Sequence, residues 1–303
     1  MNALTPARPR DPATTKLAFT EADFVAIARR AQTDFGLHLT AAKKDLVYSR
    51  LAKRLRLLGL GDFAAYCRFI ESPAGVAERI EMLSALTTNV THFFREEHHF
   101  QTLRNSVLPP LIEAARSGRR VRIWSAGCSA GQEPYSLAFT LLDLCPDASR
   151  LDIRILATDV DPAIANRAKD GIYSADEIQS LPDRMRDRHL VAAPKGMFAI
   201  GEQPRQLIRF GVLNLIQDWP FSGSFDVIFC RNVAIYFDKP TQARLWKRFS
   251  DVLAPGGTLC IGHSERLGGP AVACFEPVGV TTYRKSNSTA ATAASIPTRG
   301  AAG

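Results

Sequence analysis

The clearest indication of the fold of this chain is the stretch VRIWSAGCSAGQEPYSLA, residues 121–138. It begins as a short apolar strand, and the small residues 127–131 then separate this strand from the acid Glu133. Glycine allows backbone turns that other residues resist, and small side chains let another group lie close to the backbone. We therefore expect a strand, a tight turn and a helix, with either a ligand or a packed side chain against the turn.

The alternation of strand and helix continues on the carboxyl side of this stretch. Short apolar strands are expected at 152–160, 225–232 and 258–264, and helices at 134–144, 161–171 and 241–253. This order predicts a mostly parallel, doubly wound (Rossmann-like) α/β sheet over residues 119–285, with residues 280–285 as a final antiparallel edge strand. The pattern breaks at 175–215, and within this region residues 189–215 are expected to form several short antiparallel strands. We therefore predict a small β-subdomain inserted at about 175–213.

The amino-terminal part of the chain has helical patterns instead. A first helix is expected between the cap Thr20 and Gly36, a second between Thr40 and Gly59, and a third at 62–72. We predict an all-helical domain over residues 17–88, followed by a linker helix over 89–118. The ends, residues 1–16 and 286–303, are rich in Ala, Pro, Ser, Thr and Gly, so we expect both to be disordered.

Composition limits the classes of protein to which the chain can belong. The 303 residues are 46% hydrophobic and 22% charged, which suits a globular protein, and no apolar run reaches the roughly 18 residues of a membrane span. The start of the chain lacks the apolar core of a secretory signal, and six cysteines show no metal-ligand spacing. We expect a cytoplasmic protein with reduced thiols and no metal. The net charge of +8 favours an acidic partner: nucleic acid, anionic membrane or an acidic protein surface.

The exits of the first two strands indicate a ligand. In open α/β sheets the ligand lies beyond the carboxyl ends of the strands, where the strand order reverses. The second strand ends in Asp159, and an acid at that place commonly accepts hydrogen bonds from the ribose hydroxyls of a nucleoside cofactor. The alternative is that Asp159 caps the next helix, although Asp161, directly before Pro162, is the better cap.

Glu133 narrows the choice of nucleoside cofactor. A dinucleotide places its pyrophosphate at the helix amino terminus that follows the first strand. Here that position carries a carboxylate, which would repel phosphate and would suit an ammonium group. S-adenosylmethionine offers ribose and ammonium and has no phosphate, so the acid favours it over NAD.

Four blocks of the chain resemble the CheR family of chemotaxis receptor glutamate methyltransferases. They are NVTHFFREEHHF (89–100), RIWSAGCSAGQEPYSLA (122–138), ILATDVDPAIANRAKDGIY (155–173) and FDVIFCRNVAIYFDKPTQARLWKRF (225–249) with LAPGGTLCIGHSE (253–265). Together with the amino-terminal helices the resemblance covers about residues 19–285. It implies an all-helical domain, an S-adenosylmethionine-binding α/β domain and a small β-subdomain.

The resemblance also implies which residues contact the cofactor. The matching positions are Asn89, Thr91, Arg95, Glu133, Asp159, Asn214, Leu215, Asn232 and Val233, with Tyr236 nearby. Two positions depart from the family pattern. Many members have a second acid where this chain has Gln132, and a larger apolar residue where it has Ala234. Because of these two departures, the resemblance does not predict the shape of the pocket.

Arg95 and Tyr236 are the candidates for the catalytic step. A glutamate acceptor is already ionised at pH 7, so it needs orientation rather than a general base. A guanidinium fork and a phenol can supply that orientation. Two alternatives stay open: Arg95 holds the carboxylate of the cofactor instead, or Tyr236 is an ordinary half-buried aromatic residue. The nearby histidines receive no catalytic role.

The helix expected at 40–59 suggests where an acidic substrate binds. Val47, Leu51, Leu55 and Leu58 share one face that should pack inward. The basic residues lie outside this face, and those predicted to bind substrate are Arg50, Lys53, Arg54 and Arg56. A solvated basic face without function is the alternative. In the family, the corresponding surface meets the acidic methylation helices of receptors, which favours the functional interpretation.

The resulting hypothesis is a protein-glutamate O-methyltransferase. It would move a methyl group from S-adenosylmethionine to receptor glutamates and leave S-adenosylhomocysteine. We expect a monomer whose partners are receptor cytoplasmic helices, and in some family members a receptor carboxyl-terminal peptide at the β-subdomain. The alternatives are a nucleic-acid methyltransferase and a non-catalytic signalling module. Against the former, the third strand ends in CRNVAIY and lacks the Asp/Asn-Pro-Pro-aromatic tetrad of amino-methylases that act on bases.

Overall fold

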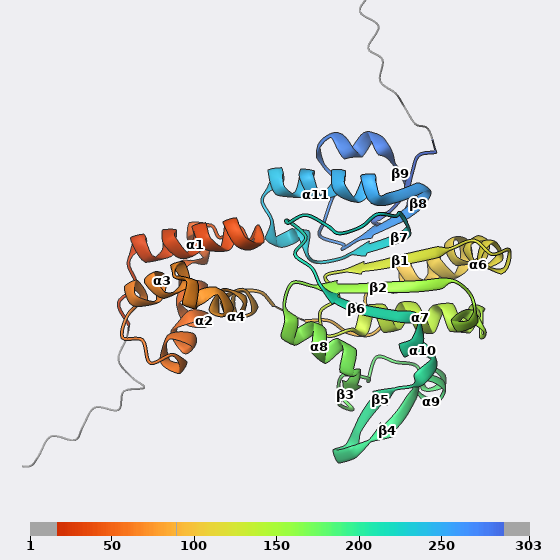
Figure 1. Cartoon of the computed structure of the whole chain (residues 1–303), viewed down its shortest axis with the longest axis horizontal. Helices are drawn as coiled ribbons and strands as arrows, with labels where there is room; N and C mark the ends of the chain where they lie inside the picture. The colour runs from red at the N-terminus through yellow and green to blue at the C-terminus, as the bar shows by residue number, and fades with distance from the viewer. Residues whose placement is uncertain (1–16, 89, 288–303) are drawn as a thin grey trace, which may run out of the picture.

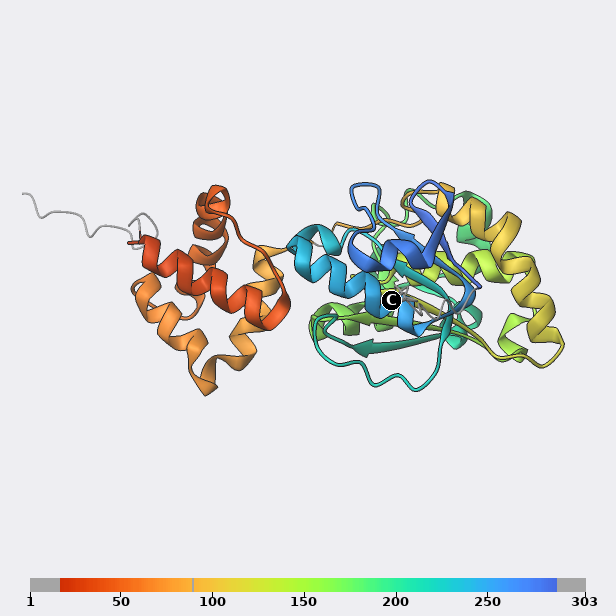
Figure 2. The same ribbon diagram turned by 90° about the horizontal axis from the view of Figure 1, so that it is seen from above.

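The computed structural model describes residues 17–88 and 90–287. The expectations of disorder at 1–16 and from 288 onward, and the position of Asn89, lie outside the described residues. The chain forms two lobes, a small helical domain and a larger α/β domain, which stay side by side in both views (Figure 1, Figure 2). No helix in the described ranges is both long and apolar enough to cross a membrane.

Four helices build the small domain around one apolar core. They are α1 (Glu21–Phe35), α2 (Lys44–Leu57), α3 (Phe63–Glu71) and α4 (Val76–Leu86). Thr20 caps α1 as expected, because its hydroxyl accepts the N–H of Asp23 while the Asp23 carboxylate accepts the N–H of Thr20. Gly36 ends this helix in the left-handed conformation. The first helix is therefore confirmed at both ends.

The second helix differs from its expected form. Thr40 precedes only a short 3₁₀ turn, Ala41–Lys43, and makes no side-chain cap bond. Val47, Leu51 and Leu55 are buried as expected, whereas Leu58 is exposed. The expectation for Leu58 was wrong because α2 ends one residue earlier, so that the helical spacing no longer directs this side chain inward.

The linker is helical only in its second half. Residues 91–97 are irregular, and the helical structure consists of α5 (His98–Thr102), a π-helical turn (Leu103–Val107) and α6 (Leu108–Arg116). The predicted linker helix is therefore wrong over the block that carries Thr91 and Arg95. Phe94 and Glu96 have positive φ angles of 54° and 56°, so a helix cannot include them.

The α/β domain contains a seven-stranded sheet in the order β6-β2-β1-β7-β8-β10-β9. The strands are β1 (Val121–Ala126), β2 (Ile153–Asp159), β6 (Ile208–Val212), β7 (Phe225–Cys230), β8 (Leu253–Ile261), β9 (Phe275–Gly279) and β10 (Thr282–Lys285). The first five in spatial order run parallel, and β10 and β9 continue the sheet antiparallel. This confirms the mostly parallel sheet.

Helices cover both faces of the sheet, as a doubly wound fold requires. In Figure 1, α11 (Lys239–Val252) lies on one face, and α7 (Gln132–Leu144) and α8 (Pro162–Asp170) lie on the other. Alternate residues of the central strands enter opposite cores: Ile123 packs into the core of α7, and Trp124 packs into the core of α11. The central strands are therefore buried on both faces and read as continuous apolar runs.

Two expectations for the sheet were wrong. Residues 280–285 do not form its edge, because β9 pairs beyond β10. The three-stranded antiparallel sheet of the β-subdomain contains β3 (Ile172–Tyr173), β4 (Leu190–Ala193) and β5 (Met197–Ile200), with α9 (Asp183–His189) between β3 and β4. The next strand, β6, follows α10 (Glu202–Leu207) and pairs in parallel with β2, so it belongs to the main sheet. Its half-exposed pattern explains the error, since edge strands resemble antiparallel ones in sequence.

Candidate functional site

A cavity of about 290 Å³ lies between the two domains. It sits at the carboxyl ends of β1, β2 and β7, and β1 is the point where the strand order reverses. That position is where open α/β sheets bind their ligands. The helical domain closes the other side with residues from α1, α4 and the segments that follow them: Phe35, Leu37, Leu83, Ser84, Thr87 and Thr88.

The turn after β1 has small residues where neighbouring side chains leave no space and where the backbone borders the cavity. A Cβ added to Gly127 would lie 2.4 Å from Cγ2 of Val233, and one added to Gly131 would lie 2.8 Å from Oη of Tyr173 and 3.0 Å from Cβ of Ala168. Both glycines also have positive φ angles. Packing inside the protein therefore accounts for glycine at both positions, and Gly127 in addition lines the cavity, where a ligand could lie against it.

Asp159 ends β2 and lines the cavity, as the sequence predicted. Its Oδ2 accepts the N–H of Ser129 at 2.9 Å, and its Oδ1 accepts the N–H of Asp161 at 3.1 Å. Asp161, and not Asp159, caps α8 by accepting the N–H groups of Ala163 and Ile164. Burial raises the pKa of Asp159 above its ordinary value. The carboxylate is thus fixed at the cavity by the turn that follows β1.

Glu133 also lines the cavity, in the first turn of α7. Its Oε1 accepts the hydroxyl of Ser125 at 2.7 Å, and its Oε2 accepts Nη1 of Arg231 at 3.1 Å. Burial raises the pKa of Glu133, and the charge of Arg231 acts against this rise. The acid expected to receive an ammonium group therefore already has one cationic partner.

Arg231 is a site residue that the sequence reasoning missed. Its side chain is almost fully buried, directly after β7, and it lines the cavity. Besides Glu133 it bonds the carbonyl oxygen of Arg95, and its Nη2 lies 3.7 Å from Oε2 of Glu96. The available signal was a lone arginine directly after the apolar run 227–230. Arg231 therefore connects the linker residues Arg95 and Glu96 to Glu133 in α7.

Arg95 and Thr91 both line the cavity, from the irregular linker. Nη1 of Arg95 donates to the carbonyl oxygen of Val90 at 2.7 Å. This contact folds the guanidinium back along its own segment. The geometry is compatible with either role proposed for Arg95, orientation of a substrate carboxylate or retention of the cofactor carboxylate.

Tyr236 joins the two domains at the cavity. Its hydroxyl accepts the N–H of Thr88 at 3.1 Å and lies 3.2 Å from the Thr88 carbonyl oxygen, to which it donates. Its own carbonyl oxygen accepts the N–H of His38 at 2.8 Å, next to a β-bridge between Leu37 and Phe237. Tyr236 therefore lines the cavity, and its ring also packs, partly buried, against the apolar core of the helical domain, so both interpretations of this residue stay open.

The remaining predicted contacts also meet at the cavity. Asn214, Leu215, Asn232 and Val233 line it. Nδ2 of Asn214 donates to the carbonyl oxygen of Asp34 in α1 at 2.7 Å, so this amide holds the two domains together. All the predicted cofactor contacts among the described residues thus converge on one cavity, although they come from five separate segments.

The predicted substrate arginines have partners inside the helical domain. Arg50 donates to the carbonyl oxygens of Ala85 and Thr87 at 3.1 and 2.8 Å. Arg54 makes two hydrogen bonds to the buried carboxylate of Glu78, at 3.0 and 2.5 Å. These contacts show a structural role for both arginines. Of the four predicted residues, Lys53 and Arg56 are the ones that are exposed.

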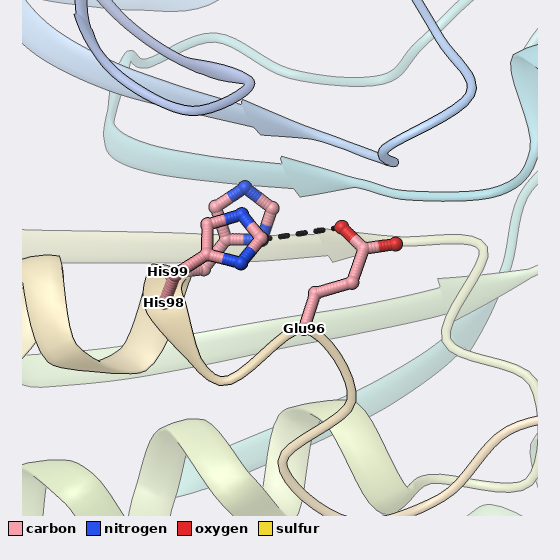
Figure 3. A group of neighbouring side chains, drawn as sticks. All are labelled: Glu96, His98 and His99. Atoms are coloured by element: carbon pink, nitrogen blue, oxygen red, sulfur yellow. Dashed lines mark ion pairs between the residues drawn. The ribbon is translucent and has the colours of Figure 1, made fainter.

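A cluster of three polar side chains, Glu96, His98 and His99, lies at the start of α5 (Figure 3). One ligand-type atom from each lies within 4.8 Å of the others, and Nε2 of His99 contacts Oγ1 of Thr281 at 3.0 Å. Burial, with the nearby charge of Arg231, lowers the pKa of His99 to about 3. Because the same guanidinium lies close to Glu96 and would repel a dication, the cluster is better described as a charge network than as a metal centre.

Comparison with known proteins places the chain in a family. The profile described as "CheR methyltransferase, all-alpha domain" matches residues 22–87, and "CheR methyltransferase, SAM binding domain" matches residues 89–284. A probable chemotaxis protein methyltransferase of Rhizobium etli is 51% identical, with 83% of this chain and 95% of the relative covered. Chemotaxis protein methyltransferases of Borreliella burgdorferi (36%, covering 88% and 95%) and Pseudomonas aeruginosa (number 2; 40%, covering 82% and 88%) also match. The chain therefore belongs to the CheR family of chemotaxis protein methyltransferases.

Proposed function

We propose that this protein transfers a methyl group from S-adenosylmethionine to glutamate side chains of methyl-accepting chemotaxis receptors in the cytoplasm. The products would be glutamate methyl esters and S-adenosylhomocysteine. The observation that carries the proposal is the cavity between the domains, which gathers Arg95, Glu133, Asp159 and Tyr236 at the switch point of the sheet. The family supports the cofactor, because its larger domain is described as binding S-adenosylmethionine.

The two acids have acceptor capacity left for the cofactor. An ionised carboxylate offers about four lone-pair sites, and Asp159 uses two of them on backbone N–H groups. The remaining sites suit the two ribose hydroxyls. Glu133 likewise uses two sites, on Ser125 and Arg231, which leaves capacity for the cofactor ammonium. Fixed acceptors of this kind bind without a large loss of side-chain entropy.

The methyl transfer itself needs no proton movement. A lone pair of the substrate carboxylate oxygen would form the new C–O bond as the methyl C–S bond breaks, and the bound S-adenosylmethionine would supply the methyl group and take the bonding electrons as a neutral thioether. The glutamate is ionised at pH 7, so the protein has only to align it with the methyl carbon. Arg95 and Tyr236 would provide this alignment from the cavity wall. In that step the Tyr236 hydroxyl would exchange the Thr88 carbonyl oxygen for the substrate oxygen.

The helical domain would carry the receptor surface. Lys53 and Arg56 project into solvent from α2 and suit the acidic methylation helices of receptors. Arg50 and Arg54 would add positive charge while their contacts hold α2 against α4. The exposed Val191 on β4, an outer strand of the small sheet, would suit the receptor carboxyl-terminal peptide.

Base lability of the transferred label tests the proposal. Methyl-labelled S-adenosylmethionine is incubated with the protein and a receptor cytoplasmic fragment, and the product is treated briefly with mild alkali. A carboxyl methyl ester releases volatile methanol, whereas N-methyl groups and ribose ethers survive. We expect volatile label from the receptor fragment, and almost none with Arg95→Ala. Base-stable label in the receptor fragment would contradict an ester product, and label in RNA or DNA supplied in parallel would support a nucleic-acid methyltransferase.

A further inference from the structure

The loop that follows β7 forms one wall of the cavity. Asn232, Val233, Ile235 and Tyr236 all line the cavity, and the loop ends in a short 3₁₀ turn, Ala234–Tyr236. Asn232 has a φ angle of 60°, in the left-handed region that asparagine tolerates better than most residues with a side chain. One other group in the chain accepts the backbone N–H groups of this loop and holds the wall in shape.

That group is the carboxylate of Glu265. Its Oε2 accepts the N–H of Gly262 at 2.5 Å and of Asn232 at 3.0 Å, and its Oε1 accepts the N–H of Val233 at 3.0 Å and of Ile235 at 3.2 Å. Four backbone donors use all the ordinary acceptor sites of one carboxylate. Hydrogen bonds to an ionised acceptor are about twice as strong as neutral ones. The residue is 4% exposed and does not line the cavity itself.

The packing around this carboxylate allows little movement of the loop. A Cβ added to Gly262 would lie 2.7 Å from the backbone nitrogen of Asn232 and 2.9 Å from Oε2 of Glu265. Val233 occupies the space that a side chain at Gly127, in the turn after β1, would need. The loop therefore lies between the turn after β1 and the Glu265 carboxylate, with little free space on either side.

We propose that Glu265 is a positioning residue for cofactor binding, which acts by holding the backbone of residues 232–235 in its binding shape. This inference rests on the proposed placement of S-adenosylmethionine in the cavity. The carboxylate is required because it alone offers acceptors to two pairs of N–H groups. A glutamine would keep one oxygen for one pair and turn an NH₂ group toward the other pair, which would force that half of the loop away.

The test compares Glu265→Gln with Glu276→Gln, a matched change of an exposed glutamate on β9. Calorimetry measures the affinity for S-adenosylhomocysteine, and hydrogen exchange followed by mass spectrometry measures protection of residues 231–236. We expect Glu265→Gln to weaken binding by about tenfold or more, with faster exchange in this segment. The KM for S-adenosylmethionine should rise more than kcat falls. The control should behave as the unaltered protein.

The result that overturns the inference is unchanged affinity in folded Glu265→Gln, or unchanged exchange at 231–236. If this variant fails to fold, Glu265→Asp replaces it, since the charge stays while the shorter side chain cannot reach both N–H pairs. Unchanged affinity of that folded variant overturns the inference equally. Failure of the unaltered protein to bind S-adenosylhomocysteine would instead contradict the proposed function, so the two failures are distinguishable.

Discussion

Replacing Asp159 by alanine should weaken the binding of S-adenosylmethionine without unfolding the protein. The carboxylate lies at the end of β2, in the wall of the cavity, and two of its acceptor sites are free for a ligand. A hydrogen bond to a charged group contributes roughly 1.5–3 kcal/mol. Loss of this contribution raises the dissociation constant by roughly 10- to 100-fold, since about 1.4 kcal/mol corresponds to a factor of ten.

The same change also releases two backbone N–H groups, those of Ser129 and Asp161. Both belong to segments that line the cavity, so part of the measured loss would come from a loosened turn. Asp159→Asn separates the effects in part, because its amide oxygen can still accept one of the two N–H groups, whereas its NH₂ group cannot accept the other and the charge is gone. If charge and ribose contacts dominate, the asparagine variant should lose nearly as much affinity as the alanine variant.

Calorimetric titration with S-adenosylmethionine and with S-adenosylhomocysteine measures the effect. Asp152→Ala serves as the matched control, because this exposed acid lies just before the opposite end of the same strand. Its affinity should equal that of the unaltered protein. A folded Asp159→Ala variant that binds both ligands with unchanged affinity would refute the placement of the ribose at this carboxylate.

Three further outcomes follow from the described contacts. Replacing both Lys53 and Arg56 by glutamate should leave the binding of S-adenosylhomocysteine intact, while methylation of a receptor fragment falls, most strongly at low salt. Methylation equal to that by the unaltered protein would show that α2 does not contact the receptor. Arg54→Met should lower the free energy of unfolding by about 3–5 kcal/mol, because Glu78 keeps its burial and loses its charged partner, and denaturant titration checks this. Burial lowers the pKa of His189 to about 4, so the unfolded chain binds more protons than the folded chain between pH 4 and 6.5. The stability of the protein should therefore fall as the pH falls through this window. Thermal unfolding of His189→Phe should show a weaker dependence of stability on pH.

The sequence predicted the parts of the fold that depend on local pattern. Thr20 and Gly36 mark α1 because a capping box and a left-handed stop are local features. The central strands were recognisable because burial on both faces gives a continuous apolar run. β6 was assigned to the wrong sheet because its apolar residues alternate with other residues, as in a half-covered antiparallel strand. β9 was not expected because four of its five residues are exposed, so it has no apolar pattern. Leu58 was misplaced because a helix can end one residue before its periodic pattern does.

The site was predictable where position alone implies chemistry. Asp159 and Glu133 stand at strand and helix ends that the α/β pattern locates. Arg231 and Glu265 were not found, because their roles depend on partners more than 30 residues away in the sequence. The same reason explains Arg54, whose structural partner Glu78 belongs to a different helix. Contacts between distant segments decide whether a charge serves a ligand or the fold.

The β-bridge between Leu37 and Phe237 joins the two domains at the cavity, and residues of both domains line it. A small molecule held there touches both, so its binding free energy includes the work of keeping the helical domain docked. A receptor that binds the helical domain, as proposed, would act on the same equilibrium between the docked and undocked positions of that domain. By thermodynamic reciprocity, any factor by which receptor binding changes cofactor affinity equals the factor by which the cofactor changes receptor affinity. Under the proposed function, a factor different from one would couple the exchange of S-adenosylhomocysteine for fresh cofactor to the release of the methylated receptor.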